Sequence, residues 1–153
     1  MSADPTQLER PSWSALTTTH SHFALGNDLA RRYQPDVAPM AAIREVSDSC
    51  LQALIALMIP GDVVGLFTSK PISAIRDLVV VADKMVEKMV YDGNRAAPIT
   101  DAHVKNLTPA DVPEIMHLVE LTKPGPFSAR TIALGSYIGI RTGGQGCSGL
   151  PVY

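Results

Sequence analysis

The residues with the clearest chemical potential lie in a short segment near residue 125. It reads Leu121-Thr-Lys-Pro-Gly-Pro-Phe127 and is followed closely by Arg130. Two prolines around a glycine make a stiff loop, and a stiff loop that presents an aromatic ring is a common wall of a substrate pocket. The alternative is a connector that only packs two helices together. The residues expected to bind substrate are Thr122, Pro124, Gly125, Pro126, Phe127 and Arg130.

Glycines near residue 145 match two phosphate-binding signatures. Gly144–Gly149 fits GxGxxG, and Arg141–Gly146 fits the Q/R-x-x-G-x-G/A pattern with which acyltransferases hold the pyrophosphate of an acyl-CoA. Both signatures need a helix directly after the loop, because the amides at its N-terminus bind the phosphates. Four residues follow Gly149 and one of them is Pro151. We therefore expect no helix there and assign no cofactor-binding residues.

The remaining titratable residues form no recognisable catalytic or metal-binding set. His20 and His22 would share one face of a strand, but a catalytic zinc site takes three protein ligands and no third is near in sequence. Glu114 and Glu120 lie opposite the apolar stripe of their helix, which favours a solvated role over that of a general base. Cys50 lies in an apolar helix and is expected to be inert. The catalytic residues stay unknown, and no metal is expected.

The elements that position the loop are indicated by local signals. Thr108-Pro109-Ala-Asp111 combines a capping hydroxyl, a proline at the first helical position and an acid at the third. The helix that follows carries an apolar stripe at Val112, Ile115, Met116 and Val119. Lys123-Pro-Gly-Pro ends it, and Ser128 is expected to cap a second short helix through Leu134. Strands are expected at His103–Leu107 and Tyr137–Arg141, the latter leading into a hairpin turn at Thr142–Gln145.

The first half of the chain mixes expected strands with one helix. Strands are predicted over residues 37–43, 62–68 and 78–81, with Pro39 favouring an edge position. A helix is predicted from Ser47-Asp48 to Pro60-Gly61. The residues Gly26-Asn27-Asp28 are typical of a turn. Residues 83–91 fit a helix and a bulged strand almost equally well.

The fold class predicted is therefore α/β in the mixed α+β sense, in two halves. Residues 1–12 are expected to be a flexible arm and residues 13–95 an N-terminal α/β half. Tyr91–Arg95 reads as a turn and a boundary. Residues 96–145 form a second part with two helices and an incomplete sheet, and residues 146–153 form a tail without strand alternation.

One family resemblance builds on these residues. The run MHLVELTKPGPFSARTIALGSYIGIRTGGQ (Met116–Gln145) resembles the opening of the acetyltransferase domain in a branch of the GNAT superfamily of N-acetyltransferases. Trp13–Ile43 and Ile59–Phe67 resemble the half that precedes this domain. The resemblance covers roughly residues 11–145 and is loose from residue 69 to residue 102.

The resemblance implies acetyl transfer from acetyl-CoA to an amine of a small molecule or a protein, with the Lys123–Phe127 loop lining the acceptor side. Family members continue after IRxGG with a strand similar to LVAMAGE and later with the pyrophosphate loop and its helix. This sequence reads GCSGLPVY instead, which predicts a truncation before the cofactor half. The alternative is a compact natural variant with a flexible tail. Without a following strand, Tyr137–Arg141 would leave an exposed sheet edge that favours self-association.

Composition and charge exclude several classes of protein and partner. The chain has 153 residues, of which 46% are hydrophobic and 18% charged, so it is too apolar for a disordered chain. A net charge of −2 with scattered basic residues predicts no nucleic-acid partner. The longest apolar run, Ala53–Ile59, is too short to span a membrane. Two cysteines and the lack of a secretory signal favour a cytoplasmic location.

Three functions remain open on this basis. The first is N-acetyltransfer, with the chain itself inactive because its cofactor-binding half is missing. The second is a folded remnant that acts as an interaction or regulatory module without catalysis. The third is a gene fragment without a selected role. Saturable binding of acetyl-CoA would distinguish the first from the other two.

Overall fold

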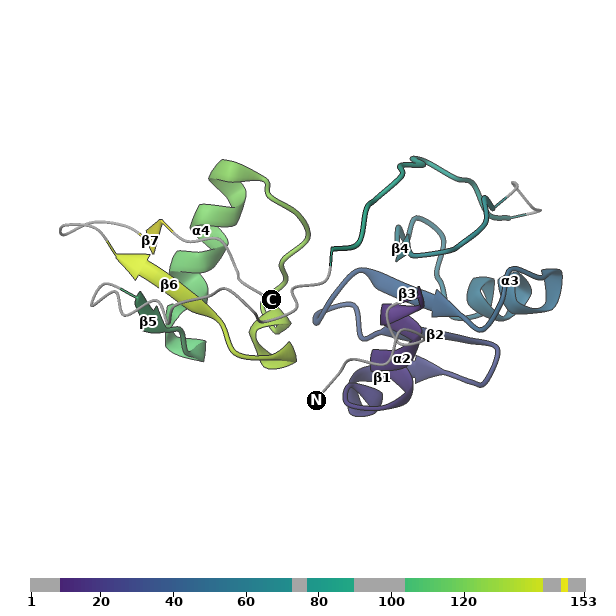
Figure 1. Ribbon diagram of the computed structural model, residues 1–153, viewed down its shortest axis with the longest axis horizontal. Coiled ribbons are helices and arrows are strands. Elements are labelled where there is room, and N and C mark those ends of the chain that lie inside the picture. Colours follow the sequence, from purple (N-terminus) through teal and green to yellow (C-terminus); the bar gives the residue numbers. More distant parts are fainter. Residues whose placement is uncertain (1–8, 73–76, 90–103, 142–146, 149–153) are drawn as a thin grey trace. The chain divides into compact units, whose positions relative to one another are not determined.

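The computed structural model describes residues 9–72, 77–89, 104–141 and 147–148. The chain forms two compact units: unit 1 is Met1–Pro35 with Pro39–Met89, and unit 2 is Asp36–Ala38 with Val90–Tyr153. Each unit combines helices with a sheet (Figure 1), so the predicted mixed α/β class is confirmed. The turn and boundary predicted at Tyr91–Arg95 lie outside the described residues.

Unit 1 contains a sheet of four strands in the order β1-β2-β3-β4. The first three strands are antiparallel, and β4 runs parallel to β3. The strands are β1 (Ala24–Gly26), β2 (Ala30–Tyr33), β3 (Met40–Ile43) and β4 (Gly65–Leu66). The helices are α2 (Pro11–Thr17), the 3₁₀ turn η1 (Ser21–Phe23) and α3 (Asp48–Ile55). Because α2 begins at Pro11, the last two residues of the predicted arm are helical.

The turn predicted at Gly26-Asn27-Asp28 joins β1 to β2. The side-chain oxygen of Asn27 accepts hydrogen bonds from the backbone N–H groups of Leu29 at 2.8 Å and Ala30 at 3.2 Å. Gly26 has a φ of +123°, a conformation that only glycine adopts readily. The turn therefore follows from local chemistry, and the prediction is confirmed.

The core of unit 1 lies between α3 and the sheet. Its buried members are Ala30, Ala41, Ile43, Cys50, Leu51 and Leu54. Cys50, which we expected to be inert, is fully buried. α3 ends at Ile55 and not at Pro60, because the next backbone bonds tighten to the i→i−3 pattern, from Leu57 N–H to Leu54 and from Met58 N–H to Ile55.

A buried arginine ties the chain that follows α3 to the sheet. The Arg32 side chain donates to the Asp62 carboxylate at 2.5 Å and to the Leu57 carbonyl oxygen at 3.1 Å. The residue is only 5% exposed, and its Nε has no hydrogen-bond partner in the part of the chain that the structure describes. The Arg32 hydrogen bond, with a further one from Ile59 N–H, holds the pKa of Asp62 below its ordinary value of 3.8.

Several predicted strands of unit 1 are shorter than expected or absent. The strand expected over residues 37–43 begins at Met40, and it lies between β2 and β4 and not at an edge. Pro39, which lacks an N–H donor, precedes it. The strand expected over residues 62–68 is reduced to Gly65–Leu66, and both residues are half-buried.

The apolar stretch from residue 79 to residue 89 forms neither the helix nor the strands that its spacing allowed. Within the described residues it has no regular element, and its valines and methionines are exposed. Met85 is 100% exposed and Met89 93% exposed. A regular element gains most of its stability from burying one apolar face. These side chains bury none, so the predictions for residues 78–81 and 83–91 are wrong over the described residues.

Unit 2 contains an antiparallel sheet in the order β5-β6-β7. Its strands are β5 (Val104–Asn106), β6 (Ile138–Arg141) and β7 (Cys147–Ser148), and its helical elements are η2 (Pro109–Asp111), α4 (Val112–Thr122) and η3 (Thr131–Leu134). β5 and β6 lie within the predicted strands, which are thereby confirmed. The hairpin turn predicted at Thr142–Gln145 lies outside the described residues.

The pairing of β7 corrects one prediction. Ile140 pairs with Ser148 and Arg141 with Cys147, whereas we expected no paired strand after Gln145. Backbone hydrogen bonds between strands do not require apolar alternation, so the lack of that pattern in the last residues was a poor guide. β6 lies between two strands, and the exposed edge from which we predicted self-association is not present at Ile140–Arg141.

The start of α4 follows the predicted signals. The Asp111 carboxylate accepts hydrogen bonds from the Thr108 backbone N–H at 2.7 Å and from its hydroxyl at 2.8 Å. These bonds fix the turn η2, from which α4 continues. Of the predicted apolar stripe, Ile115 is buried, while Met116 is 37% exposed. The stripe is therefore only partly covered by the described residues.

Candidate functional site

The predicted loop leaves α4 at a sharp turn. Thr122 is the last residue of α4, and its hydroxyl donates to the Leu118 carbonyl oxygen at 2.8 Å. Lys123 ends the helix in the left-handed conformation, with a φ of +46°. Pro124, Gly125 and Pro126 follow as an exposed segment. The structure thus places these predicted site residues together at the surface.

Phe127 is the first residue of the loop to turn inward. Its ring is half-buried and meets the Tyr137 ring edge to face, with centroids 5.7 Å apart and planes at 87°. Such a contact holds both rings in a defined orientation. Phe127 is therefore held by the Tyr137 ring, just before β6, as well as by the prolines before it.

Arg130 forms an ion pair that the sequence did not indicate. Its Nη1 lies 2.9 Å from Asp36 Oδ2, and its backbone N–H donates to the Asp36 carbonyl oxygen at 3.1 Å. Both side chains are about half exposed. Asp36 belongs to the three-residue part of the chain, Asp36–Ala38, that folds with unit 2. No spacing rule relates residues this far apart in sequence.

Thr131, which is buried, also binds the Asp36–Ala38 segment. The side chain is buried, and its hydroxyl donates to the Val37 carbonyl oxygen at 2.6 Å while accepting from the Ser128 backbone N–H at 2.7 Å. The Tyr137 hydroxyl donates to the Thr131 carbonyl oxygen at 3.2 Å. We call the six connected residues the Thr131 cluster: Asp36, Val37, Phe127, Arg130, Thr131 and Tyr137.

The cluster corrects one local prediction and extends another. Ser128 does not cap the second helix with its hydroxyl; η3 begins at Thr131, whose own hydroxyl receives the Ser128 N–H. Phe127 and Arg130, predicted together on one loop, both belong to this cluster, whose contacts involve backbone carbonyl oxygens as well as side chains. Asp36, Thr131 and Tyr137 were not among the predicted site residues, because their contacts arise only from folding.

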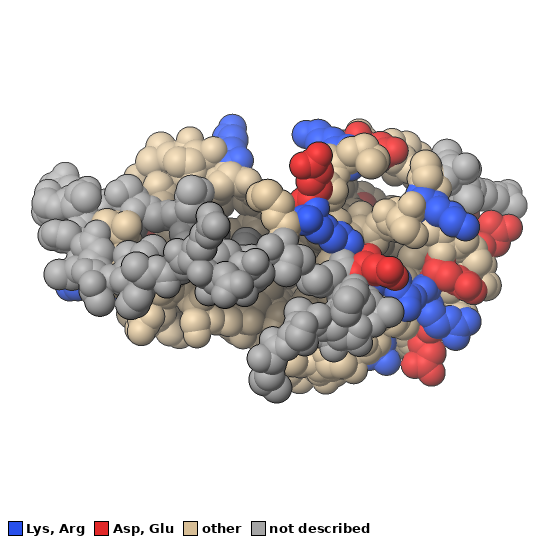
Figure 2. Space-filling model, in the orientation of Figure 1, with Lys and Arg blue, Asp and Glu red and all other residues tan. Residues whose placement is uncertain are grey.

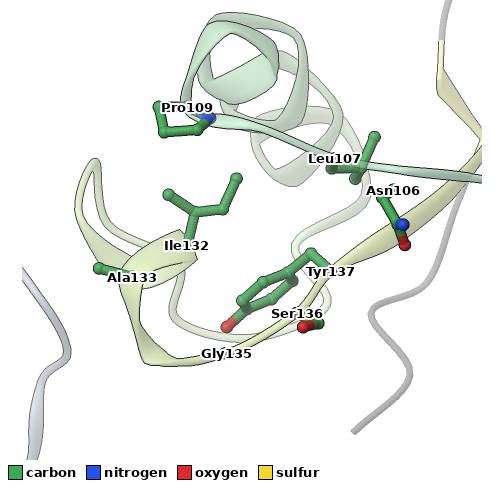
Figure 3. A pocket seen from close by; sticks show the side chains of 8 residues that line it. All are labelled: Asn106, Leu107, Pro109, Ile132, Ala133, Gly135, Ser136 and Tyr137. Carbon is green, nitrogen blue, oxygen red and sulfur yellow. The ribbon is translucent and has the colours of Figure 1, made fainter.

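A hollow of about 390 Å³ opens beside this cluster (Figure 3). Its walls come from the end of β5, the start of η2, η3 and the chain leading into β6. The lining residues are Asn106, Leu107, Pro109, Ile132, Ala133, Gly135, Ser136 and Tyr137. None of the six predicted site residues lines it. Tyr137 belongs both to the hollow and to the Thr131 cluster.

The two histidines do not share a strand face as expected. His20 precedes η1 and His22 lies in it. His20 Nδ1 is 2.8 Å from the Tyr33 hydroxyl, and burial raises the pKa of that hydroxyl. The His22 ring lies against Phe23, with centroids 3.9 Å apart. Among the residues that the structure describes, no three metal-binding side chains come together.

The two acidic residues of α4 differ in exposure. Glu120 is exposed, in keeping with the solvated role predicted for it, whereas Glu114 is half-buried. Glu114 also has an interaction with a neighbouring group. The prediction of a solvated face is therefore confirmed for Glu120 and only partly for Glu114.

Of the two glycine-rich signatures, Arg141–Gly146 is followed by a strand. Arg141 ends β6, and Cys147–Ser148 form β7 directly after the Arg141–Gly146 signature and inside the Gly144–Gly149 signature. A strand leaves its backbone N–H groups paired across the ladder, whereas a phosphate needs the free N–H groups of a helix start. Residues 142–146 lie outside the described part of the chain. Within the described residues, a strand and not a helix follows Gly146.

The charged side chains on the surface are mixed in sign, as the net charge of −2 suggests. On the face drawn in Figure 2, basic side chains lie beside acidic ones and form no large patch of one sign among the residues coloured there. No helix in the described ranges is long and apolar enough to cross a membrane.

The fold is similar to that of a solved protein that has been assigned as an acetyltransferase. The crystal structure of a protein assigned to the GNAT family, from Novosphingobium aromaticivorans, matches 91% of this chain with a TM-score of 0.71 and 24% sequence identity. The chain covers 61% of the length of that protein. No protein-family model matches the sequence, and no curated protein matches it.

The comparison confirms the fold that the motif resemblance implied. A TM-score of 0.71 over nine-tenths of the chain includes most of both units. Since the two sequences are only 24% identical, the likeness establishes the fold, and activity has to be argued from the residues.

Proposed function

We propose that this chain is a member of the GNAT family and supplies the acceptor side of an N-acetyltransferase. The reaction is transfer of an acetyl group from acetyl-CoA to an amine of a small molecule or a protein, in the cytoplasm. The single observation that supports this most is the shared fold over 91% of the chain. The LTKPGPFSARTIALGSYIGIR motif falls on the α4–loop–η3–β6 part of that fold.

The Thr131 cluster supports an acceptor-binding role for the loop. Two prolines restrict the chain on one side of Phe127, and the Tyr137 ring restricts it on the other. An aromatic ring that is already immobile loses little entropy when a ligand binds. The loop residues Thr122, Pro124, Gly125 and Pro126 are exposed and within reach of a ligand from solvent.

The proposal does not extend to binding of acetyl-CoA by the Arg141–Gly146 segment. The Arg141–Gly146 signature does not fit a pyrophosphate, because a strand follows it. We therefore propose that this 153-residue chain does not hold acetyl-CoA through that segment and is inactive in acetyl transfer by itself.

Titration of the chain with primary amines tests the acceptor role. Lysine amide, spermidine and phenethylamine are added to ¹⁵N-labelled protein while backbone amide shifts are followed. We expect saturable shifts at residues 122–130 with at least one amine, and weaker binding in Phe127→Ala. Ile59→Ala, at an exposed apolar residue of unit 1, is the matched control. The absence of shifts in this loop with all three amines would overturn the acceptor role.

Titration with acetyl-CoA tests the cofactor side. Isothermal calorimetry at millimolar acetyl-CoA is expected to give no saturable heat. Saturable binding would show that the chain holds its cosubstrate by itself, and the proposed inactivity would then be wrong.

A second candidate function is that of a non-catalytic interaction module. It is favoured by the exposed apolar stretch of residues 79–89, since exposed side chains of this type often mark contact surfaces. This function predicts neither amine nor acetyl-CoA binding. The amine titration therefore separates it from the acetyltransferase, since both functions predict no acetyl-CoA binding by this chain.

A further inference from the structure

The hollow beside η3 has the composition of a small-molecule site. Its apolar walls are Leu107, Pro109, Ile132 and Ala133, with the aromatic ring of Tyr137 (Figure 3). Its volume of about 390 Å³ lies within the range of ligand pockets, which is about 300–1,000 Å³. It therefore has room for a molecule the size of a substituted aromatic ring.

Two polar side chains complete the lining. Asn106 offers a carboxamide and Ser136 a hydroxyl, and both residues are exposed. Within the described ranges, neither side chain has a hydrogen-bond partner of its own. Each group can both donate and accept. A ligand with an amide or a hydroxyl could satisfy either of them.

The walls are fixed before any ligand arrives. The Leu107 backbone N–H donates to the Tyr137 carbonyl oxygen at 2.8 Å, which joins the two sides of the hollow. The Tyr137 hydroxyl is held by the Thr131 carbonyl oxygen. A Cβ placed on Gly139 would lie 3.0 Å from the Leu107 side chain, so Leu107 packs directly on the β6 backbone. A pre-formed site of this kind spends little free energy on reorganisation.

The charge of the lining limits the ligand. Among the described residues that line the hollow, none is Asp, Glu, Lys, Arg or His. A charged ligand would lose hydration there without gaining an ion pair. The ligand is accordingly neutral.

We propose that this hollow binds a small neutral molecule that has an aromatic or short aliphatic body and one amide or hydroxyl group. None of the residues of the Thr122–Phe127 loop lines the hollow, although the Tyr137 ring borders the hollow and contacts Phe127. The inference rests on the lining residues and not on the proposed acetyltransferase function.

Benzamide is the probe for this site. The full-length ¹⁵N-labelled chain is titrated with benzamide and, separately, with benzoate and toluene, while amide shifts are followed. We expect saturable shifts at Asn106, Ile132, Ser136 and Tyr137 with benzamide. Benzoate, which is charged, and toluene, which lacks the polar group, should each bind at least several-fold more weakly. Equal binding of benzamide and benzoate would overturn the neutral-ligand assignment.

Two variants locate the binding. Ala133→Trp places a large ring in the hollow and should abolish the benzamide shifts, whereas Ala56→Trp, at an exposed alanine of unit 1 outside the lining, should leave them unchanged. If Ala133→Trp fails to fold, Ser136→Ala serves instead, since this exposed hydroxyl holds no described contact. It should weaken benzamide several-fold and leave toluene unaffected. Shifts that persist in Ala133→Trp, or that occur only in unit 1, contradict the proposal.

Discussion

The hydroxyl of Thr131 donates a hydrogen bond of 2.6 Å to the carbonyl oxygen of Val37, 94 residues earlier in the chain. Both residues are buried. Arg130 binds the neighbouring Asp36 through its backbone and its side chain. Residues 36–38 are therefore a structural part of unit 2, although β2 and β3 of unit 1 flank them in sequence.

Thr131→Val should destabilise the protein by about 1–3 kcal/mol. Valine keeps the shape of threonine but leaves the buried Val37 carbonyl oxygen and the Ser128 N–H without their partner, and a buried unpaired group carries that cost. Thr131→Ser keeps the hydroxyl and should lose less. Urea unfolding followed by circular dichroism measures both variants.

Arg130→Gln is the comparison for this prediction. Its ion pair with Asp36 is about half exposed, and exposed pairs contribute less than about 1 kcal/mol. We expect Arg130→Gln to unfold within that margin of the wild type. A cost equal to that of Thr131→Val would show that the buried hydroxyl is not what holds residues 36–38.

The Arg32–Asp62 pair predicts an acid limit on stability. Arg32 holds the pKa of Asp62 below its ordinary value of 3.8, so the folded state releases this proton more readily than the unfolded state. The stabilisation is present above the unfolded pKa and is lost as the pH falls through the lower folded value. Asp62→Asn should therefore lower stability at pH 6, and the difference from the wild type should shrink below about pH 4.

Urea midpoints measured from pH 7 to pH 2.5 test this. Asp28→Asn is the matched control, because Asp28 faces Arg31 only across 3.5 Å and its side chain is 94% exposed. The control should show no such convergence with the wild type. A constant difference between Asp62→Asn and wild type at every pH would mean that the carboxylate charge does not matter.

Local signals predicted much of the fold. Thr108, Pro109 and Asp111 lie within four residues and specify the start of a helix, and the structure contains the expected hydrogen bonds. Asn27 likewise specifies the β1–β2 turn. In each case the donor and the acceptor are close in sequence, so pattern and geometry coincide.

Contacts between distant residues could not be predicted in the same way. The Arg130–Asp36 ion pair and the Thr131–Val37 hydrogen bond each join residues 94 positions apart, and no local sequence pattern indicates either contact. Both contacts form only when unit 2 folds. Residues 83–89 show the opposite failure: their spacing fits a helix, but they bury no face. The Thr131 cluster has the same limit: the motif led us to predict Phe127 and Arg130 as site residues, but it gave no signal for Tyr137, whose ring contacts Phe127.

Gly26→Ala should destabilise the β1–β2 hairpin by more than about 1 kcal/mol. Gly26 has a φ of +123°, and an added Cβ would lie 2.2 Å from the Ala30 carbonyl oxygen. Gly125→Ala is the matched control, because a Cβ there meets nothing within 4 Å. Its stability should stay within about 0.5 kcal/mol of the wild type. Thermal melts of both variants measure the difference, and equal melting temperatures would contradict the turn geometry.

Methionine oxidation should follow exposure along the chain. Met85 and Met89 are 100% and 93% exposed, whereas Met40 and Met58 are half-buried. Peroxide reaches a thioether from solvent, so accessible methionines become sulfoxides first. We expect Met85 and Met89 to oxidise several-fold faster than Met40 and Met58 in the folded protein, with Met116 in between.

Trypsin and mass spectrometry separate these rates, because cleavage after Lys84 and Lys88 places Met85 and Met89 in different peptides. A parallel reaction in enough urea to unfold the protein is the control, and all five methionines named should then oxidise at similar rates. If Met85 is protected in the native protein but not in urea, residues 79–89 are covered in solution. The exposed apolar stretch would then be an occupied contact surface, which favours the interaction module over the acetyltransferase.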